Sequence, residues 1–321
     1  MKKYAIMAIG TIFLVLYFIR IDYNELFTRA VNFPIMYACG IIGLNVINGV
    51  IKSIRWRYFL RRYGVNSNLL KDYLSVNSAF FLGLVTPGTA GELSRVMSIG
   101  KESRKGISII LFEKLTDFGF LILCVIISVL LQLTGGVKLY FSILCLLIIL
   151  ATVYYLFIRF NEAITSPVKF ILSKVLNPGK INNAKDTYED FCFLLRNPGF
   201  LFISSIMSLL LWLLPLTQVY LIYYGVGLNP SIKFVALAYF LPYFFGIISF
   251  VPLGIGTFEF SLREVAIYNG GTILSEIVSV TPLFYRIFVT IPLIIFGYAC
   301  QIILTVIEKK AKGSRSFSTV N

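Results

Sequence analysis

The sequence of 321 residues contains no histidine, and only 14% of its residues are charged. Without histidine, the chain lacks the base of Ser/His/Asp and Cys/His catalysis, histidine metal ligands and histidine proton relays. Its five cysteines form no CxxC pair and lie mainly in apolar stretches, where a free cysteine behaves as a small hydrophobic residue. We therefore expect no metal site, no disulfide framework and no cofactor.

The scarcity of charge is matched by an excess of apolar residues. Hydrophobic residues make up 58% of the chain and the mean hydropathy is +0.84, whereas soluble domains are about 45–50% apolar and about 25% charged. The net charge of +14 is spread over short basic runs between apolar stretches, which is typical of cytoplasmic loops rather than of nucleic-acid binding. The composition predicts an all-α polytopic membrane protein.

A membrane-spanning helix needs about 20 apolar residues. Six stretches meet that length: residues 4–21, 34–52, 106–133, 139–158, 199–224 and 284–307. Two others, residues 73–98 and 232–268, are interrupted by proline and glycine. We expect about six full spans and two broken segments in a single domain, residues 1–310, followed by a basic cytoplasmic tail, residues 311–321. Because no small-residue cleavage site follows residues 4–21, they are interpreted as a span rather than a signal peptide.

The distribution of lysine and arginine gives the orientation. Basic residues cluster in four regions: residues 52–71, 95–114, 159–198 and 309–315. By the positive-inside rule, these regions and both termini face the cytoplasm, which places the protein in the cell membrane. Both ends of segment 73–98 then face the cytoplasm, whereas the flanks of segment 232–268 lack basic residues and face outward. Both broken segments are predicted to be re-entrant, from opposite faces.

The two breaks have similar sequences. Each contains a proline, two glycines, a glutamate and then an arginine three or four residues later, as in "PGTAGELSR" from Pro87 and "PLGIGTFEFSLR" from Pro252. Such a pair of interrupted segments predicts an inverted repeat with a transporter's substrate site between its halves. The predicted site residues are Pro87, Gly88, Gly91, Glu92, Arg95, Pro252, Gly254, Gly256, Glu259, Arg263 and Arg286.

The chemistry expected at the breaks is anion binding. Where a helix restarts, its first N–H groups carry a partial positive charge, and Arg95 or Arg263 would add a full one beside a wet cavity. A phosphate head group fits such a site. The alternative is structural: Thr89-x-x-Glu92 matches a capping box, and each glutamate–arginine spacing suits an ion pair within one helix.

Four more charged residues leave two interpretations open. Glu113, Lys114 and Asp117 open the span at residues 106–133, either as gating or coupling groups or as interfacial ion pairs. Arg286 is either the partner of a glutamate or substrate, or a side chain that reaches the outer interface.

Other polar and aromatic features are expected to be structural. Asn45 and Asn48, three residues apart, would form hydrogen bonds between helices. The aromatic runs "YLIYY" and "YFLPYFF" fit the aromatic belts at membrane interfaces.

At these motifs the chain resembles the membrane domain of the lysylphosphatidylglycerol synthase/flippase family. The resemblance rests on "TPGTAGELSRV", "FEKLTD", "VPLGIGTFE" and "YRIF" and extends over about residues 1–310. It implies a domain that moves a lipid between leaflets. In two-domain relatives a cytoplasmic acyltransferase domain makes the aminoacyl lipid; only residues 308–321 follow the last expected span, so we expect no such domain and no synthase activity.

Three functions remain open at this point. The first is a flippase-like transporter of an anionic or glycosylated lipid. The second is a membrane-embedded lipid transferase, which usually needs clustered aspartates or a histidine; here Asp117 has no aspartate neighbour. The third is a non-transporting partner of an envelope-lipid synthase. The lipid, the energy source and the oligomeric state do not follow from the sequence.

The topology makes a direct prediction. In a variant without native cysteines, a cysteine at Gly100 should react with an impermeant thiol reagent only from the cytoplasm, and one at Gly270 only from outside. Labelling of position 100 from outside alone would contradict the re-entrant interpretation of residues 73–98.

Overall fold

The computed structural model describes residues 12–13, 15–19, 23–133, 178–270 and 275–318. Within these ranges every regular element is a helix, which confirms the all-α prediction. The elements are α2 (Tyr23–Val31), α3 (Ile35–Arg62), α4 (Leu69–Val85), the 3₁₀-helix η1 (Pro87–Glu102), α5 (Ser103–Leu133), α8 (Pro178–Arg196), α9 (Pro198–Gly225), α10 (Ile232–Ile248), the 3₁₀-helix η2 (Pro252–Gly254), α11 (Thr257–Gly270), α12 (Ser275–Tyr285), the π-helix η4 (Arg286–Thr290) and α13 (Ile291–Ser318).

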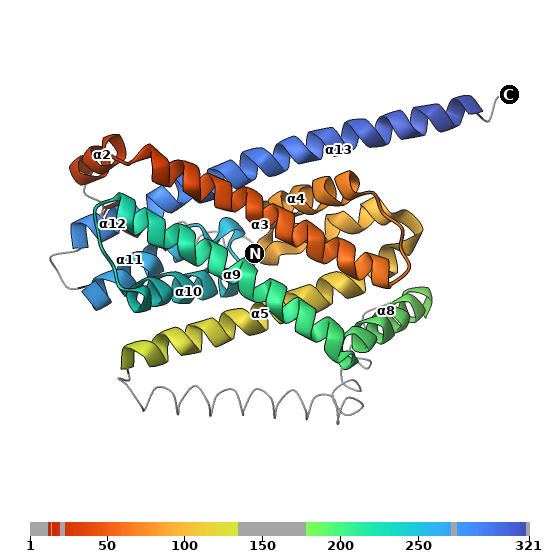
Figure 1. The fold of residues 1–321 in the computed structure, drawn as a ribbon, viewed down its shortest axis with the longest axis horizontal. Helices are drawn as coiled ribbons and strands as arrows, with labels where there is room; N and C mark the ends of the chain where they lie inside the picture. Colours follow the sequence, from red (N-terminus) through yellow and green to blue (C-terminus); the bar gives the residue numbers. More distant parts are fainter. Residues whose placement is uncertain (1–11, 14, 20–22, 134–177, 271–274, 319–321) are drawn as a thin grey trace.

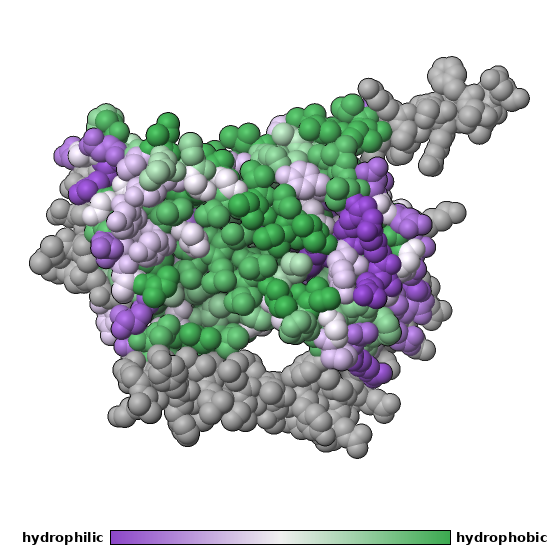
Figure 2. Space-filling view, in the orientation of Figure 1, coloured by the Kyte–Doolittle hydropathy of each residue, from purple (hydrophilic) through white to green (hydrophobic). Residues whose placement is uncertain are grey.

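Four helical stretches are long and apolar enough to cross a membrane: Ile35–Arg62, Ser103–Gln132, Pro198–Gly225 and Val280–Ile307. They correspond to four of the six predicted spans. The other two, residues 4–21 and 139–158, lie mostly or wholly outside the described residues. Figure 2 shows an apolar belt across the middle of the molecule with hydrophilic residues at both ends, as expected where long helices cross hydrocarbon.

Two helical hairpins enter the bundle from its opposite ends (Figure 1). The first hairpin, α4 with η1, begins and ends where α3 finishes and α5 starts. The second hairpin, α10 with η2 and α11, begins and ends at the opposite end, where α9 finishes. Both turns lie near the middle of the molecule. The chain thus repeats the order of a long helix, a hairpin and a long helical span, with the hairpins facing in opposite directions.

The breaks fall where the sequence places them, but their geometry differs. Helix α4 ends at Val85, two residues before Pro87, and the chain returns as η1, a 3₁₀-helix of 16 residues. Runs of more than three or four residues of 3₁₀-helix are uncommon and often mark a hinge or strain. The second hairpin restarts as a regular α-helix at Thr257.

Helix α3 is longer than the apolar stretch that predicts it. It continues past Lys52 to Arg62. The prediction stopped at Lys52 because hydropathy detects where a chain crosses an apolar layer and does not detect where a helix ends. Lys52 and Arg55, assigned from the sequence to a cytoplasmic loop, therefore lie within the bundle, and Arg55 is only 3% exposed.

Two hydrophobic cores hold the elements around the turns. The first core packs the second hairpin against α9 and α12, with Tyr223, Leu262 and Phe284 at its centre. The second core packs α3, α5, α8 and α9 around Trp56 and Phe112. Tyr223 comes from the run "YLIYY" and is fully buried, so the interfacial role expected for that run is wrong at this position.

Close packing within the first hairpin depends on Gly91. A Cβ atom at this position would lie 2.2 Å from the Leu82 carbonyl oxygen and 2.7 Å from the Gly83 backbone nitrogen. Since the obstructing atoms belong to the backbone of α4, the two arms of the hairpin could not keep this separation with any larger residue.

We expect Gly91→Ala to lower the unfolding temperature in detergent, with a loss of about 1–3 kcal/mol, the usual cost of overpacking. Gly43→Ala in α3 is the matched control, because a Cβ atom there meets nothing within 4 Å and alanine favours the helix. A Gly91→Ala protein as stable as the control would show that the hairpin is not packed in this way.

Candidate functional site

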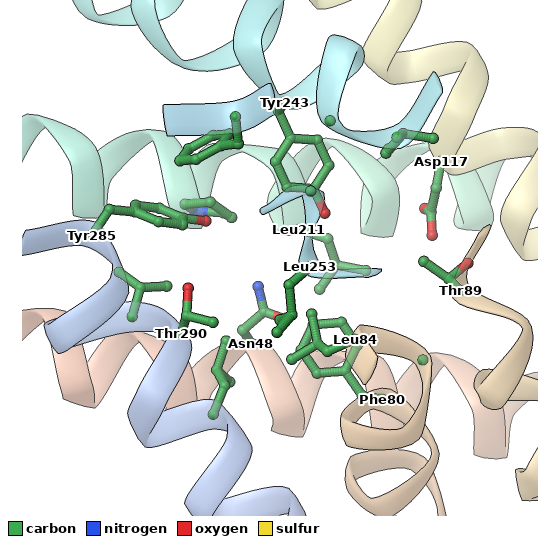
Figure 3. A pocket seen from close by; sticks show the side chains of 18 of the residues that line it. Asn48, Phe80, Leu84, Thr89, Asp117, Leu211, Tyr243, Leu253, Tyr285 and Thr290 are labelled. Atoms are coloured by element: carbon green, nitrogen blue, oxygen red, sulfur yellow. The ribbon is translucent and has the colours of Figure 1, made fainter. Parts of the chain in front are cut away.

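A cavity of about 380 Å³ lies between the turns of the two hairpins. The first hairpin contributes Gly83 and Thr89 to its wall, and the second contributes Gly246 and Leu253; α3, α5, α9 and the region from Tyr285 to Leu293 complete it. In Figure 3, Thr89 and Asp117 lie together on one side of the cavity, and Tyr285 and Thr290 lie together on the other. Both breaks therefore line the same space.

Each turn holds a non-glycine residue in the left-handed backbone region. Thr89 has φ of 58° and Leu253 has φ of 59°. This conformation is unfavourable for side chains with a Cβ atom, most of all for a β-branched residue such as threonine, and such strain clusters at ligand sites and hinges. Both residues line the cavity.

The Thr86 side chain bonds to the backbone on both sides of the first turn. The Thr86 hydroxyl accepts a hydrogen bond of 2.7 Å from the Gly91 N–H and donates one of 2.8 Å to the Leu82 carbonyl. The predicted capping box instead required Thr89 as the cap, and the strained Thr89 does not take that place. The N–H of Gly91 is thus occupied by the protein rather than directed at a ligand.

The second turn is held by a glutamate and an arginine. The Glu259 carboxylate accepts a hydrogen bond of 2.7 Å from the Gly256 N–H, which is half of a capping box. Arg286 donates to Glu259 at 2.5 Å and to the Leu253 carbonyl at 2.9 Å. Gly256, at the start of α11, therefore does not offer a free N–H to an anion, in contrast to the expectation from the sequence.

Each break contains one glutamate, Glu92 or Glu259, and this glutamate is paired with a cation on the long span that follows its hairpin. Glu92 accepts a hydrogen bond from Lys114 of α5 at 2.5 Å, and Glu259 pairs with Arg286 at the same distance. The ion pairs expected within each short helix are not the ones that form. Of the two interpretations left open for Arg286, the structure shows a glutamate partner, Glu259.

The arginines of the two breaks, Arg95 and Arg263, form ion pairs outside the cavity. Arg95 is 5% exposed; it forms an ion pair with Glu113, and its guanidinium carbon lies 4.4 Å from the centre of the Trp56 ring. Arg263 pairs with Glu264 at 2.6 Å. Neither arginine belongs to the cavity wall, so the expectation that they face a wet cavity is not met.

A buried charge cluster supports the wall on the α5 side. Arg55 donates two hydrogen bonds to Asp117, at 2.7 and 2.8 Å, and lies 3.2 Å from Glu113. The Ser208 hydroxyl donates to Asp117 at 2.6 Å. Bidentate arginine–carboxylate pairs are geometrically specific, so Asp117 is fixed in position at the edge of the cavity. Glu113 and Asp117 are thus bundle residues rather than interfacial ones.

The amino group of Lys52, by contrast, has no carboxylate partner among the described residues. It lies 3.2 Å from the centre of the Phe80 ring. The other cavity cations, Lys114 and Arg286, are each neutralised by a glutamate. Among the described residues of the wall, Lys52 is therefore the basic side chain that no carboxylate pairs.

Five of the residues predicted for the site line the cavity: Glu92, Lys114, Asp117, Gly254 and Arg286. Pro87 and Gly88 open η1 at the first turn. The others surround the turns without lining the cavity: Gly91, Arg95, Glu113, Pro252, Gly256, Glu259 and Arg263.

The sequence interpretation missed several wall residues. Asn48 and Lys52 lie on the same face of α3 as Asn45, at positions i, i+3 and i+7, so a polar stripe in an apolar helix was the available signal. Asn45 does bond between helices, to Gln218 and to the Val289 carbonyl. Tyr243, from the run "YFLPYFF", lines the cavity, so the interfacial role expected for this run is wrong at that position.

The burial of Arg95 makes a prediction about stability. Arg95→Ala should destabilise the protein by about 3–5 kcal/mol, because it leaves the Glu113 carboxylate buried and partly unpaired. Arg104→Ala is the control: its pair with Asp186 is nearly half exposed, so the loss should stay within about 1 kcal/mol. Thermal unfolding in detergent compares the two. Equal, small losses would mean that Arg95 faces water.

Comparison with known proteins shows the family of this chain. The family model for the lysylphosphatidylglycerol synthase TM region matches residues 5–297. The UPF0104 membrane protein MJ1595 of Methanocaldococcus jannaschii is 23% identical over an alignment 288 residues long, which covers 84% of this chain and 85% of that relative. Since the family match extends over nearly the whole chain, the resemblance expected from the motifs is confirmed. The chain is a multi-pass membrane protein that belongs to the lysylphosphatidylglycerol synthase TM region family.

Proposed function

We propose that this protein moves an anionic or glycosylated membrane lipid between the two leaflets. The head group occupies the cavity between the two hairpin turns while the acyl chains stay in the bilayer. The observation that carries the proposal is the amino group of Lys52, which no carboxylate of the described chain pairs, in a cavity lined by both breaks. An anionic head group would pair with the protonated form of that group.

The size of the cavity suits this role. Its volume of about 380 Å³ falls within the usual range of small-ligand pockets, about 300–1,000 Å³. A head group fits in such a space, but a whole phospholipid with its acyl chains does not. The apolar belt on the face seen in Figure 2 would accommodate those chains outside the cavity.

The arrangement of the hairpins supports alternating access. We infer an inverted repeat, with both termini cytoplasmic in the cell membrane and each hairpin re-entrant from one face. An ion pair at the cavity wall ties each hairpin to the next long span, Glu92–Lys114 in the first and Glu259–Arg286 in the second. The first hairpin is also held to α5 behind the wall, by Arg95–Glu113. Breaking one pair at a time would open the cavity towards one face and keep it closed to the other.

This mechanism needs no covalent step, so we propose that the protein is not an enzyme. A lipid transferase activity would instead leave a chemically altered lipid. A non-transporting partner of an envelope-lipid synthase would leave the lipid unaltered on its original side. Both alternatives are outcomes of the same experiment.

The gating ion pair can be tested in reconstituted vesicles with an acyl-labelled phosphatidylglycerol and leaflet-specific quenching. Glu92→Gln should slow transport roughly tenfold, because a charge-assisted hydrogen bond contributes about 1.5–3 kcal/mol. The exchanged pair Glu92→Lys with Lys114→Glu should recover much of the rate. Glu102→Gln, which removes the surface pair with Lys105, is the control and should behave as wild type.

Two results would contradict the proposal. Mass spectrometry that finds a chemically altered lipid would favour a transferase. Unaltered lipid that never crosses, over a panel of anionic and glycosylated lipids, would favour the accessory role.

A further inference from the structure

Three uncharged polar side chains point into the middle of the cavity: the Asn48 amide, the Tyr243 hydroxyl and the Thr290 hydroxyl (Figure 3). They come from α3, α10 and the π-helical turn η4. Within the described ranges, no hydrogen bond links any of the three side chains to another residue. The neighbouring Asn45 differs, because its amide is fully engaged between helices.

Thr290 is the most informative of the three. Only 6% of the residue is exposed, and its hydroxyl lies in the one π-helical turn of the described chain. Turns of this kind occur often at functional sites. The hydroxyl has no hydrogen-bond partner among the described residues and lines the cavity, so it is free to bond with something that enters the cavity.

The hydrogen-bonding chemistry of these three side chains indicates which kind of ligand they would bind. Amide and hydroxyl groups both donate and accept hydrogen bonds, which matches the hydroxyls of a polyol or a sugar. An ammonium only donates, and it would meet the Lys52 amino group, which lies one helical turn from Asn48 and which no carboxylate of the described chain pairs. The carboxylates on the wall, Glu92 and Asp117, already hold Lys114 and Arg55.

We propose that the cavity selects lipids that join one phosphate to an uncharged, hydroxyl-rich head group, and that it disfavours head groups with a free amino group. Lys52 binds the phosphate, and Asn48, Tyr243 and Thr290 bind the hydroxyls. This inference rests on the proposed function, since it names the substrate class of the same cavity. The aminoacylated lipid suggested by the family's name is therefore a poor substrate for this chain.

The test compares binding and transport of three lipids with matched acyl chains: phosphatidylglycerol, phosphatidylethanolamine and lysylphosphatidylglycerol. Native mass spectrometry of the purified protein measures retention, and leaflet-specific quenching in vesicles measures transport. We expect phosphatidylglycerol to be retained and moved at least tenfold better than either amino lipid. Equal retention of all three, or a preference for an amino lipid, would overturn the inference.

Two variants test whether the residues of the cavity wall determine the lipid selectivity. Thr290→Val keeps the shape but removes the hydroxyl, so phosphatidylglycerol retention should fall several-fold while the unfolding temperature stays level or rises. A fall in that temperature would mean that the hydroxyl has a structural partner. Lys52→Gln should reduce the preference for phosphatidylglycerol over lysylphosphatidylglycerol at least fivefold. Thr217→Val and Lys309→Gln, both at exposed positions, are the matched controls.

The two proposals can fail separately. If no lipid crosses but retention favours phosphatidylglycerol, transport is wrong and the selectivity stands. If all three lipids cross at equal rates, transport stands and the selectivity is wrong.

Discussion

A broken backbone inside an apolar bundle must find its hydrogen bonds within the protein, because each unsatisfied group costs several kcal/mol in hydrocarbon. The rest of this structure depends on how the two breaks meet that requirement. Thr86 bonds to the N–H of Gly91 at the first turn, and Glu259 to that of Gly256 at the second. Placing these groups in the bundle brings polar atoms to its centre, and the cavity forms between them.

The carboxylates that stabilise the turns in turn require cations. Glu259 holds Arg286, which also bonds to the Leu253 carbonyl, and Glu92 holds Lys114. Behind the wall, Asp117 is held by Arg55. Because these pairs occupy the carboxylates near the cavity, the amino group of Lys52 is left for a ligand. The proposed lipid transport thus follows from the same electrostatics that keep the breaks folded.

The outline of the fold could be predicted from the sequence, since it depends on local signals. Proline and glycine mark the breaks at Pro87 and Pro252, and hydropathy locates four long helices that the structure describes. The partners within the site could not be predicted in the same way. Glu92 has Arg95 at helical spacing, but both residues pair with α5 instead, Arg95 with Glu113 and Glu92 with Lys114.

Lys52 was missed for a related reason. It stands where the apolar stretch gives way to charge, a place that normally marks a loop, and only the continuation of α3 to Arg62 brings it inside the bundle. Asn48 looked like its neighbour Asn45, and nothing in their spacing tells which of the two has a partner on α9. Such distinctions depend on where other helices lie, which a local pattern does not contain.

The meeting of the two breaks at one cavity can be measured most directly by cross-linking. Cysteines at Thr89 and Leu253, in a protein without native cysteines, would be treated in intact membranes with a short reagent that joins two thiols. An intramolecular cross-link between the two turns is expected. The pair of Thr89 and Gly43 should give none, since Gly43 faces open space on α3. If both cysteines at the turns react with a single-thiol reagent but never join, the two breaks do not share a cavity.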